Sequence, residues 1–99
     1  MTRAWFLSAA MVDVESARDW YDAQRPGLGG EFVDAVDNAV TAILDFPDAH
    51  PIVHRDARRY LLDRFPYGIY YCIEGNGVVV VACLHAARDP KRTRRRLRG

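Results

Sequence analysis

The residues of this sequence best suited to chemistry are a histidine and several arginines in its second half. His85 ends a run of apolar, mostly β-branched residues, and Arg88 follows three residues later. Histidine is the side chain whose unperturbed pKa lies near neutrality, so His85 could donate or accept a proton. The planar guanidinium of arginine suits phosphate and carboxylate groups. The pattern therefore predicts a site that meets an anion.

RNA cleavage is one reaction that such a site could perform. Attack by the 2′-hydroxyl needs a base, an acid for the leaving 5′-oxygen, and cations for the crowded phosphate. If the protein is a nuclease, the candidate catalytic residues are His85 and Arg64. The candidate residues for binding a nucleic acid or another target are Arg58, Arg59, Arg88, Arg92, Arg94 and Arg95.

Each candidate also has a structural interpretation. A histidine at a strand end is often held by a hydrogen bond, and Arg64 could pair with a carboxylate of a helix such as Asp34 or Asp37. Arg58 and Arg59 cannot both face one ligand from a regular strand, because alternate residues point opposite ways. His50 and His54 are separated by Pro51, so we expect no metal site, and the sequence calls for no cofactor.

The net charge of +1 hides a strong asymmetry. Residues 1–50 carry three arginines against nine acids, whereas residues 51–99 carry eleven of the fourteen basic residues against four acids. Six of the last nine residues are basic. This distribution favours a surface that binds an anionic target or an acidic partner, although a solvated acidic helix and a basic tail would give the same count.

Length and composition are typical of one globular domain of 99 residues, 49% of them hydrophobic. No apolar run approaches the roughly 18 residues of a membrane span. Residues 1–6 lack the length and cleavage site of a signal peptide, so we expect a cytoplasmic protein with no membrane partner. In that compartment Cys72 and Cys83 are interpreted as free thiols.

The elements that must position His85 are two strands of a β-hairpin. Residues 67–73 and 78–85 are rich in β-branched and aromatic residues, and the Asn76-Gly77 pair between them is a strong hairpin signal. Strict alternation places Cys83 and His85 away from the helices, and the face toward the helices is expected to be uniformly apolar. The residues expected on that apolar face are Tyr67, Ile69, Tyr71, Ile73, Val78, Val80, Ala82 and Leu84.

The remaining elements follow from periodicity and breakers. Residues 5–7 fit a first strand, and apolar spacings of three and four predict helices ending before Pro26 and before Pro47, with Trp20 and Tyr21 in the core. Residues 47–57 read as a connection and 58–65 as a strand. The predicted fold is α+β, in the order strand-helix-helix-strand-strand-strand, with a helical hairpin on one face of a mostly antiparallel sheet. Residues 1–90 form the domain, and residues 91–99 a flexible basic tail.

Several motifs along this chain together resemble the RelE/ParE superfamily of bacterial type II toxins. They span nearly the whole sequence in the expected order. The motifs are Asp19-Trp20-Tyr21, Gln24-Arg25-Pro26-Gly27-Leu28-Gly29, Glu31-Phe32, Arg58-Arg59, Arg64-Phe65-Pro66-Tyr67 with Ile69 and Tyr71, and His85 before Arg88-Asp89-Pro90.

The resemblance implies a growth-inhibiting toxin of the kind that stabilises plasmids, with a cognate antitoxin as partner. RelE-like members cleave messenger RNA on the ribosome, whereas ParE-like members inhibit DNA gyrase. RelE-like nucleases typically carry lysines before the second strand and a tyrosine near the end of the chain. Here Lys91 is the only lysine and no aromatic residue follows Tyr71, which favours the gyrase target. A non-toxic adaptor that binds nucleic acid through its basic tail is a third interpretation.

Overall fold

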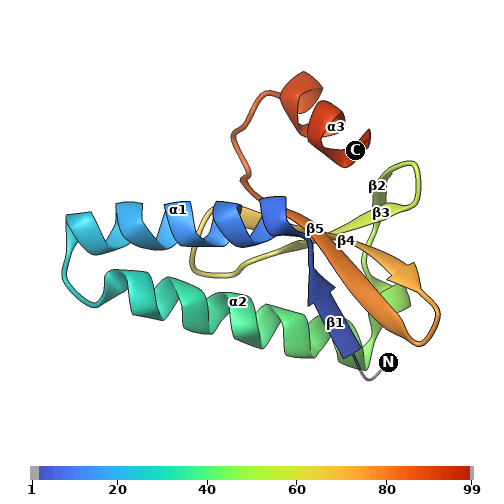
Figure 1. Ribbon diagram of the computed structural model, residues 1–99, viewed down its shortest axis with the longest axis horizontal. Coiled ribbons are helices and arrows are strands. Elements are labelled where there is room, and N and C mark those ends of the chain that lie inside the picture. Colours follow the sequence, from blue (N-terminus) through green and yellow to red (C-terminus); the bar gives the residue numbers. More distant parts are fainter. Residues whose placement is uncertain (1–2, 99) are drawn as a thin grey trace.

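The computed structural model describes residues 3–98, which form two layers and a separate C-terminal helix (Figure 1). Helices α1 (Ser8–Gln24) and α2 (Leu28–Asp45) lie antiparallel on one face of a five-stranded sheet. Helix α3 (Pro90–Arg98) packs on the opposite face of the sheet. None of the helices among the described residues is long and apolar enough to cross a membrane.

The sheet has the order β1-β5-β4-β3-β2, and only its β1–β5 pair is parallel. The predicted α+β class and the mostly antiparallel sheet are therefore confirmed. Residues 47–57 were expected to be a connection only, but they contain a 3-10 turn and a short edge strand. The elements are β1 (Arg3–Phe6), η1 (Pro47–Ala49), β2 (Ile52–His54), β3 (Ala57–Leu61), β4 (Tyr67–Glu74) and β5 (Gly77–His85).

The two long helices approach closely at their joining turn. A Cβ atom on Gly29 would lie 2.5 Å from the backbone oxygen of Arg18, so only glycine fits between the helices there. The Asp22 carboxylate accepts hydrogen bonds from the amides of Gly27 and Gly29, at 3.0 and 3.1 Å. Because the first N–H groups of a helix have no partner within the helix, Asp22 stabilises the start of α2.

The main core lies between this helical hairpin and the sheet. Helix α2 ends at Asp45, two residues before Pro47. The hydroxyl of the buried Tyr71 donates a 2.6 Å hydrogen bond to the carbonyl of Pro47. Trp20 was expected in this core, but its side chain is largely exposed at the surface of α1. The largest fully buried side chains are Tyr71, Phe32, Ile43, Ile69, Val78, Val80 and Cys83.

A β-bulge in β5 reverses the predicted facing of its second half. Tyr70 pairs with Ala82 and Tyr71 with Val80, so Val81 of β5 has no paired residue on β4. A bulge shifts the alternation by one residue. Cys83 therefore lies in the main core, whereas Ala82 and Leu84 face α3, opposite to the prediction.

The C-terminal residues form α3 rather than the flexible tail that composition had suggested. The Asp89 carboxylate accepts a 2.9 Å hydrogen bond from the Lys91 amide, and Pro90 occupies the first helical position. Both features favour helix initiation. Leu97 packs against Tyr70, Ala82 and Leu84 on the sheet. Gly99, the last residue of the predicted tail, lies outside the described residues.

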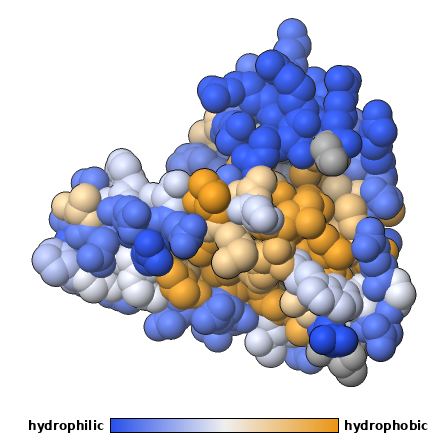
Figure 2. Space-filling model, viewed as in Figure 1, coloured by the Kyte–Doolittle hydropathy of each residue, from blue (hydrophilic) through white to orange (hydrophobic). Residues whose placement is uncertain are grey.

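The surface divides into an apolar band and a strongly hydrophilic projection (Figure 2). The projection is α3, which carries six basic residues and no acid. The exposed large apolar side chains include Trp5, Leu7, Met11 and Val12 around β1 and the start of α1. Positive charge and apolar surface are thus presented by neighbouring elements.

Candidate functional site

His85 lies at the exposed end of β5, on the side of the sheet that faces α1. Its ring meets that of Tyr67 edge to face, with centroids 5.2 Å apart, and its Nδ1 atom accepts a 3.0 Å hydrogen bond from the Ala87 amide. Burial raises the pKa of the Tyr67 phenol, which therefore stays neutral beside the imidazole. The expectation that His85 faces away from the helices was wrong, because the bulge turns it toward α1.

An open hollow of about 400 Å³ separates His85 from α1. We call it the α1 hollow. Trp20 and Ser16 form its α1 side, while Arg88 and Arg92 supply two cations. His85 therefore shares a cleft with two arginines from the chain that follows β5 and with Asp13 of α1.

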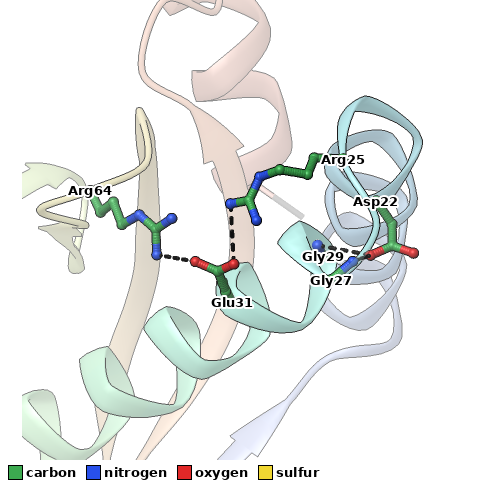
Figure 3. Close-up of polar contacts among 6 residues, drawn as sticks. All are labelled: Asp22, Arg25, Gly27, Gly29, Glu31 and Arg64. Carbon is green, nitrogen blue, oxygen red and sulfur yellow. Dashed lines mark hydrogen bonds and ion pairs between the residues drawn. The ribbon is translucent and has the colours of Figure 1, made fainter.

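Arg64 lies elsewhere, on the α2 side of the helical hairpin. Its guanidinium forms an ion pair with Glu31, which also binds Arg25 at 3.1 Å (Figure 3). The hydrogen bond from Arg64 is the main reason that the pKa of the Glu31 carboxyl is lowered. Arg64 borders a hollow on α2 that does not include His85. The two candidate catalytic residues are therefore not brought together.

Arg58 and Arg59 point to opposite faces of β3, as alternation predicts. Arg58 donates hydrogen bonds to the carbonyls of Asp48 and His50, at 3.1 and 2.8 Å, and so anchors the η1 turn to the sheet. Arg59 faces α3. Of this pair, only Arg59 is directed toward the C-terminal arginines.

A second hollow, of about 160 Å³, lies between the sheet and α3. We call it the α3 hollow. His54, Arg59, Arg88 and Arg94 line it from β2, β3, the β5–α3 connection and α3. Arg88 also borders the α1 hollow, so it links the two sites. The predicted target-binding residues Arg92 and Arg95 lie on exposed faces of α3.

Asp13 and Arg96 hold α3 against α1, and neither was singled out from the sequence. Two hydrogen bonds of 2.7 and 3.0 Å join the carboxylate to the guanidinium. Asp13 also accepts a 3.0 Å hydrogen bond from the Cys83 amide, next to the bulge. The two residues are 83 positions apart, and no local pattern in the sequence connects them. Among residues 3–98, no group of three or more His, Cys, Asp or Glu side chains is placed to bind a metal ion.

The fold, a helical hairpin on one face of a mostly antiparallel sheet, agrees with the RelE/ParE resemblance of the sequence. Residues 6–90 match the family model described as the ParE toxin of the type II toxin-antitoxin system, parDE. The match covers most of the chain. The protein therefore belongs to the ParE family of toxins from type II toxin-antitoxin modules.

A solved structure supports the same fold. The chromosomal ParDE toxin-antitoxin system from P. aeruginosa contains a chain that superposes with a TM-score of 0.76 and 16% sequence identity. The alignment covers 86% of this chain and 96% of that chain. No curated protein sequence matches the chain significantly.

Proposed function

We propose that this protein arrests growth in the cytoplasm by inhibiting DNA gyrase, and that a cognate antitoxin neutralises it. The separation of Arg64 from His85 supports this proposal, because the candidate nuclease residues occupy different hollows. Arg64 is moreover engaged by Glu31. A protein that inhibits by binding needs a complementary surface but no assembled acid–base pair.

The basic helix α3 is the surface that we assign to the target. Arg92, Arg94 and Arg95 are exposed on it, and none of them has an acidic partner among the described residues. Gyrase acts on DNA, whose phosphates attract such a surface. Arginine also binds carboxylates through its two-pronged guanidinium, so gyrase side chains could share this surface.

Two assays with the purified toxin test the target. In a supercoiling assay, we expect the toxin to inhibit gyrase, and in a cleavage assay with programmed ribosomes we expect no new cuts in the messenger RNA. Ribosome-dependent cuts that disappear in His85→Ala would overturn the proposal. If the toxin shows neither gyrase inhibition nor ribosome-dependent cleavage, and overexpression without an antitoxin leaves growth normal, both toxin mechanisms are excluded.

A charge-matched pair of variants tests the assigned surface. The variant Arg92→Gln/Arg94→Gln/Arg95→Gln should inhibit gyrase at least about tenfold less strongly, because it removes three cations from α3. The control Arg3→Gln/Arg18→Gln/Arg55→Gln removes three exposed cations outside α3 and should inhibit as the unaltered protein does. Equal loss in both variants would show that net charge alone is responsible.

RNA cleavage is the second candidate, and one observation favours it. His85 is exposed and shares the α1 hollow with Arg88 and Arg92, so an acid–base group and two cations do meet there. In that mechanism Arg88 would take the role predicted for Arg64. The ribosome assay with His85→Ala decides between this mechanism and gyrase inhibition.

The antitoxin is expected to be an acidic, amphipathic segment. Arg58 is already engaged by carbonyls and Arg64 by Glu31. Arg88 and the exposed Arg92, Arg94 and Arg95, which have no acidic partner among the described residues, are the cations that we expect to meet its carboxylates. Exposed apolar residues near α1, such as Met11 and Val12, would contact its apolar face. Raising the salt concentration should slow association more than it speeds dissociation. A salt-independent association rate, measured by stopped flow, would contradict charge steering.

A further inference from the structure

The arginines of this protein fall into two groups by their partners. Four arginines contact a carboxylate of Asp19, Glu31 or Asp13: Arg18, Arg25, Arg64 and Arg96. The three arginines of the α3 hollow have no acidic partner among residues 3–98, and no acidic residue lines that hollow. Three guanidinium groups around a small hollow repel one another unless an anion joins them.

Buried donor atoms give independent support for a ligand. The Nε atoms of Arg59 and Arg88 and the Nε2 atom of His54 are shielded from solvent and form no hydrogen bond within the described part of the chain. A buried polar group without a partner destabilises the folded protein, so such groups are rare. All three atoms belong to residues that line the α3 hollow.

The size of the hollow fits a compact group. About 160 Å³ is enough for one tetrahedral oxyanion. Arginine binds the oxygens of such an anion in pairs, and the Thr93 hydroxyl at the rim can donate a further hydrogen bond. A dianionic phosphate would offset most of the charge of the three arginines.

We propose that the α3 hollow binds one phosphate group, without catalysis, and that the bound phosphate fastens α3 to the sheet. Arg94 and Thr93 come from α3, whereas Arg59 and His54 come from the sheet. A ligand held by both sides therefore links them. Free phosphate and the phosphate of a nucleic-acid backbone both offer anionic oxygens to these donors, and the experiment distinguishes the two sources. The site does not depend on whether gyrase or the ribosome is the target.

The test is a titration of the purified full-length toxin with inorganic phosphate by calorimetry, at constant ionic strength set with chloride. Phosphate should bind, and it should slow amide exchange in residues 90–98. Arg59→Gln and Arg94→Gln should each lower the phosphate affinity at least about tenfold. Arg94 is exposed on α3, so its variant reports on the site even if Arg59→Gln folds poorly.

The matched control is Arg98→Gln, which removes the same charge from the last turn of α3 outside the hollow. It should leave the phosphate affinity within about twofold of the unaltered protein. An equal loss in Arg98→Gln, or no preference for phosphate over chloride, would overturn the proposal. Binding of a glutamate-rich peptide in the hollow without any phosphate binding would also overturn it.

Short single-stranded DNA and RNA distinguish the two sources of phosphate. If the nucleic-acid backbone is the source, Arg59→Gln weakens oligonucleotide binding more than Arg98→Gln does, and inorganic phosphate competes with the oligonucleotide. If free phosphate is the ligand, both variants bind the oligonucleotide equally while only Arg59→Gln loses inorganic phosphate. Neither gyrase nor ribosomes are present, so the outcome is independent of the proposed target.

Discussion

Asp13 of α1 and Arg96 of α3 form a two-pronged ion pair that joins the start of the chain to its end. The shorter of its two hydrogen bonds measures 2.7 Å, and the side chains are only 13% and 26% exposed. The Arg18–Asp19 pair, in contrast, lies at the surface. Because shielded pairs are screened less by water and salt, the Asp13–Arg96 pair holds α3 in place.

Substitutions at Asp13 should separate the ion pair from the hydrogen bond to the bulge. Asp13→Asn keeps an acceptor for the Cys83 amide but removes the charge, and should lower the free energy of unfolding by about 1–3 kcal/mol. Asp13→Ala also leaves the Cys83 amide without an acceptor and should lower the free energy of unfolding by about 1–2 kcal/mol more. Urea denaturation measures both. Asp19→Asn, in the exposed pair with Arg18, should change stability by only about 0–1 kcal/mol.

Truncating Leu97 should loosen α3 without unfolding the domain. Leu97 is the apolar contact between α3 and the Tyr70–Leu84 cluster, and it is half-buried. Leu97→Ala should cost about 1 kcal/mol and raise amide exchange in residues 90–98. Exchange in α2 should stay unchanged. If Arg98→Ala, at an exposed position, accelerates exchange equally, Leu97 does not hold the helix.

The sequence was most informative where one local pattern determines one element. The Asn76-Gly77 pair predicted the hairpin, and Pro47 predicted where α2 ends. The prediction of which face each β5 side chain occupies was wrong after Val80, because the bulge adds a residue and no Gly or Pro marks its position in the sequence. The prediction for His85 failed for the same reason.

The sequence contains a start signal for the C-terminal helix, but the basic composition that follows it was given more weight. Asp89 and Pro90 form a strong helix start, yet the dense positive charge that follows indicated a flexible tail. Its docking depends on Leu97 and on the pairing of Arg96 with Asp13, which only the fold brings together. Likewise, Arg64 pairs with Glu31 rather than with the predicted Asp34 or Asp37.

Alanine substitutions at two neighbouring glycines at the start of α2 should change the stability of the protein in opposite directions. In Gly29→Ala the new methyl group would meet the Arg18 backbone at 2.5 Å, so the helices must separate, at a cost of about 1–3 kcal/mol. In Gly30→Ala no atom lies within 4 Å, and the gain in helix propensity should stabilise the protein by about 0.5–1 kcal/mol. Thermal unfolding measures both. Equal shifts would contradict the close approach of α1 and α2 at Gly29.

Glu31 should make stability depend on pH in the acidic range. Its pKa is lowered in the folded protein, first by the hydrogen bond from Arg64. The stabilisation from the carboxylate is therefore complete above the ordinary pKa of 4.5, and it is lost as the pH falls through the lower folded value. Glu31→Gln should be less stable than the unaltered protein at neutral pH, and the difference should shrink on acidification. The control Glu15→Gln removes the same charge at an exposed position of α1. If its stability difference changed with pH as much as that of Glu31→Gln, the ion pairs of Glu31 would not be the cause.

The two cysteine thiols should react slowly and at different rates. Burial, followed by the negative charge of Asp56, raises the pKa of Cys72 to about 11, and burial followed by Asp13 raises that of Cys83 to about 12. Since the thiolate is the nucleophile, Cys72 should react with iodoacetamide at pH about 8 some 100-fold more slowly than an unperturbed thiol of pKa 9.0. Cys83 is also buried in the core, so it should react more slowly still. Mass spectrometry of the labelled peptides orders the two sites, and labelling in urea gives the unperturbed rates. If Cys83 were labelled as fast as Cys72 in the folded protein, the core beneath the β5 bulge would have to open far more often than its packing with α1 allows.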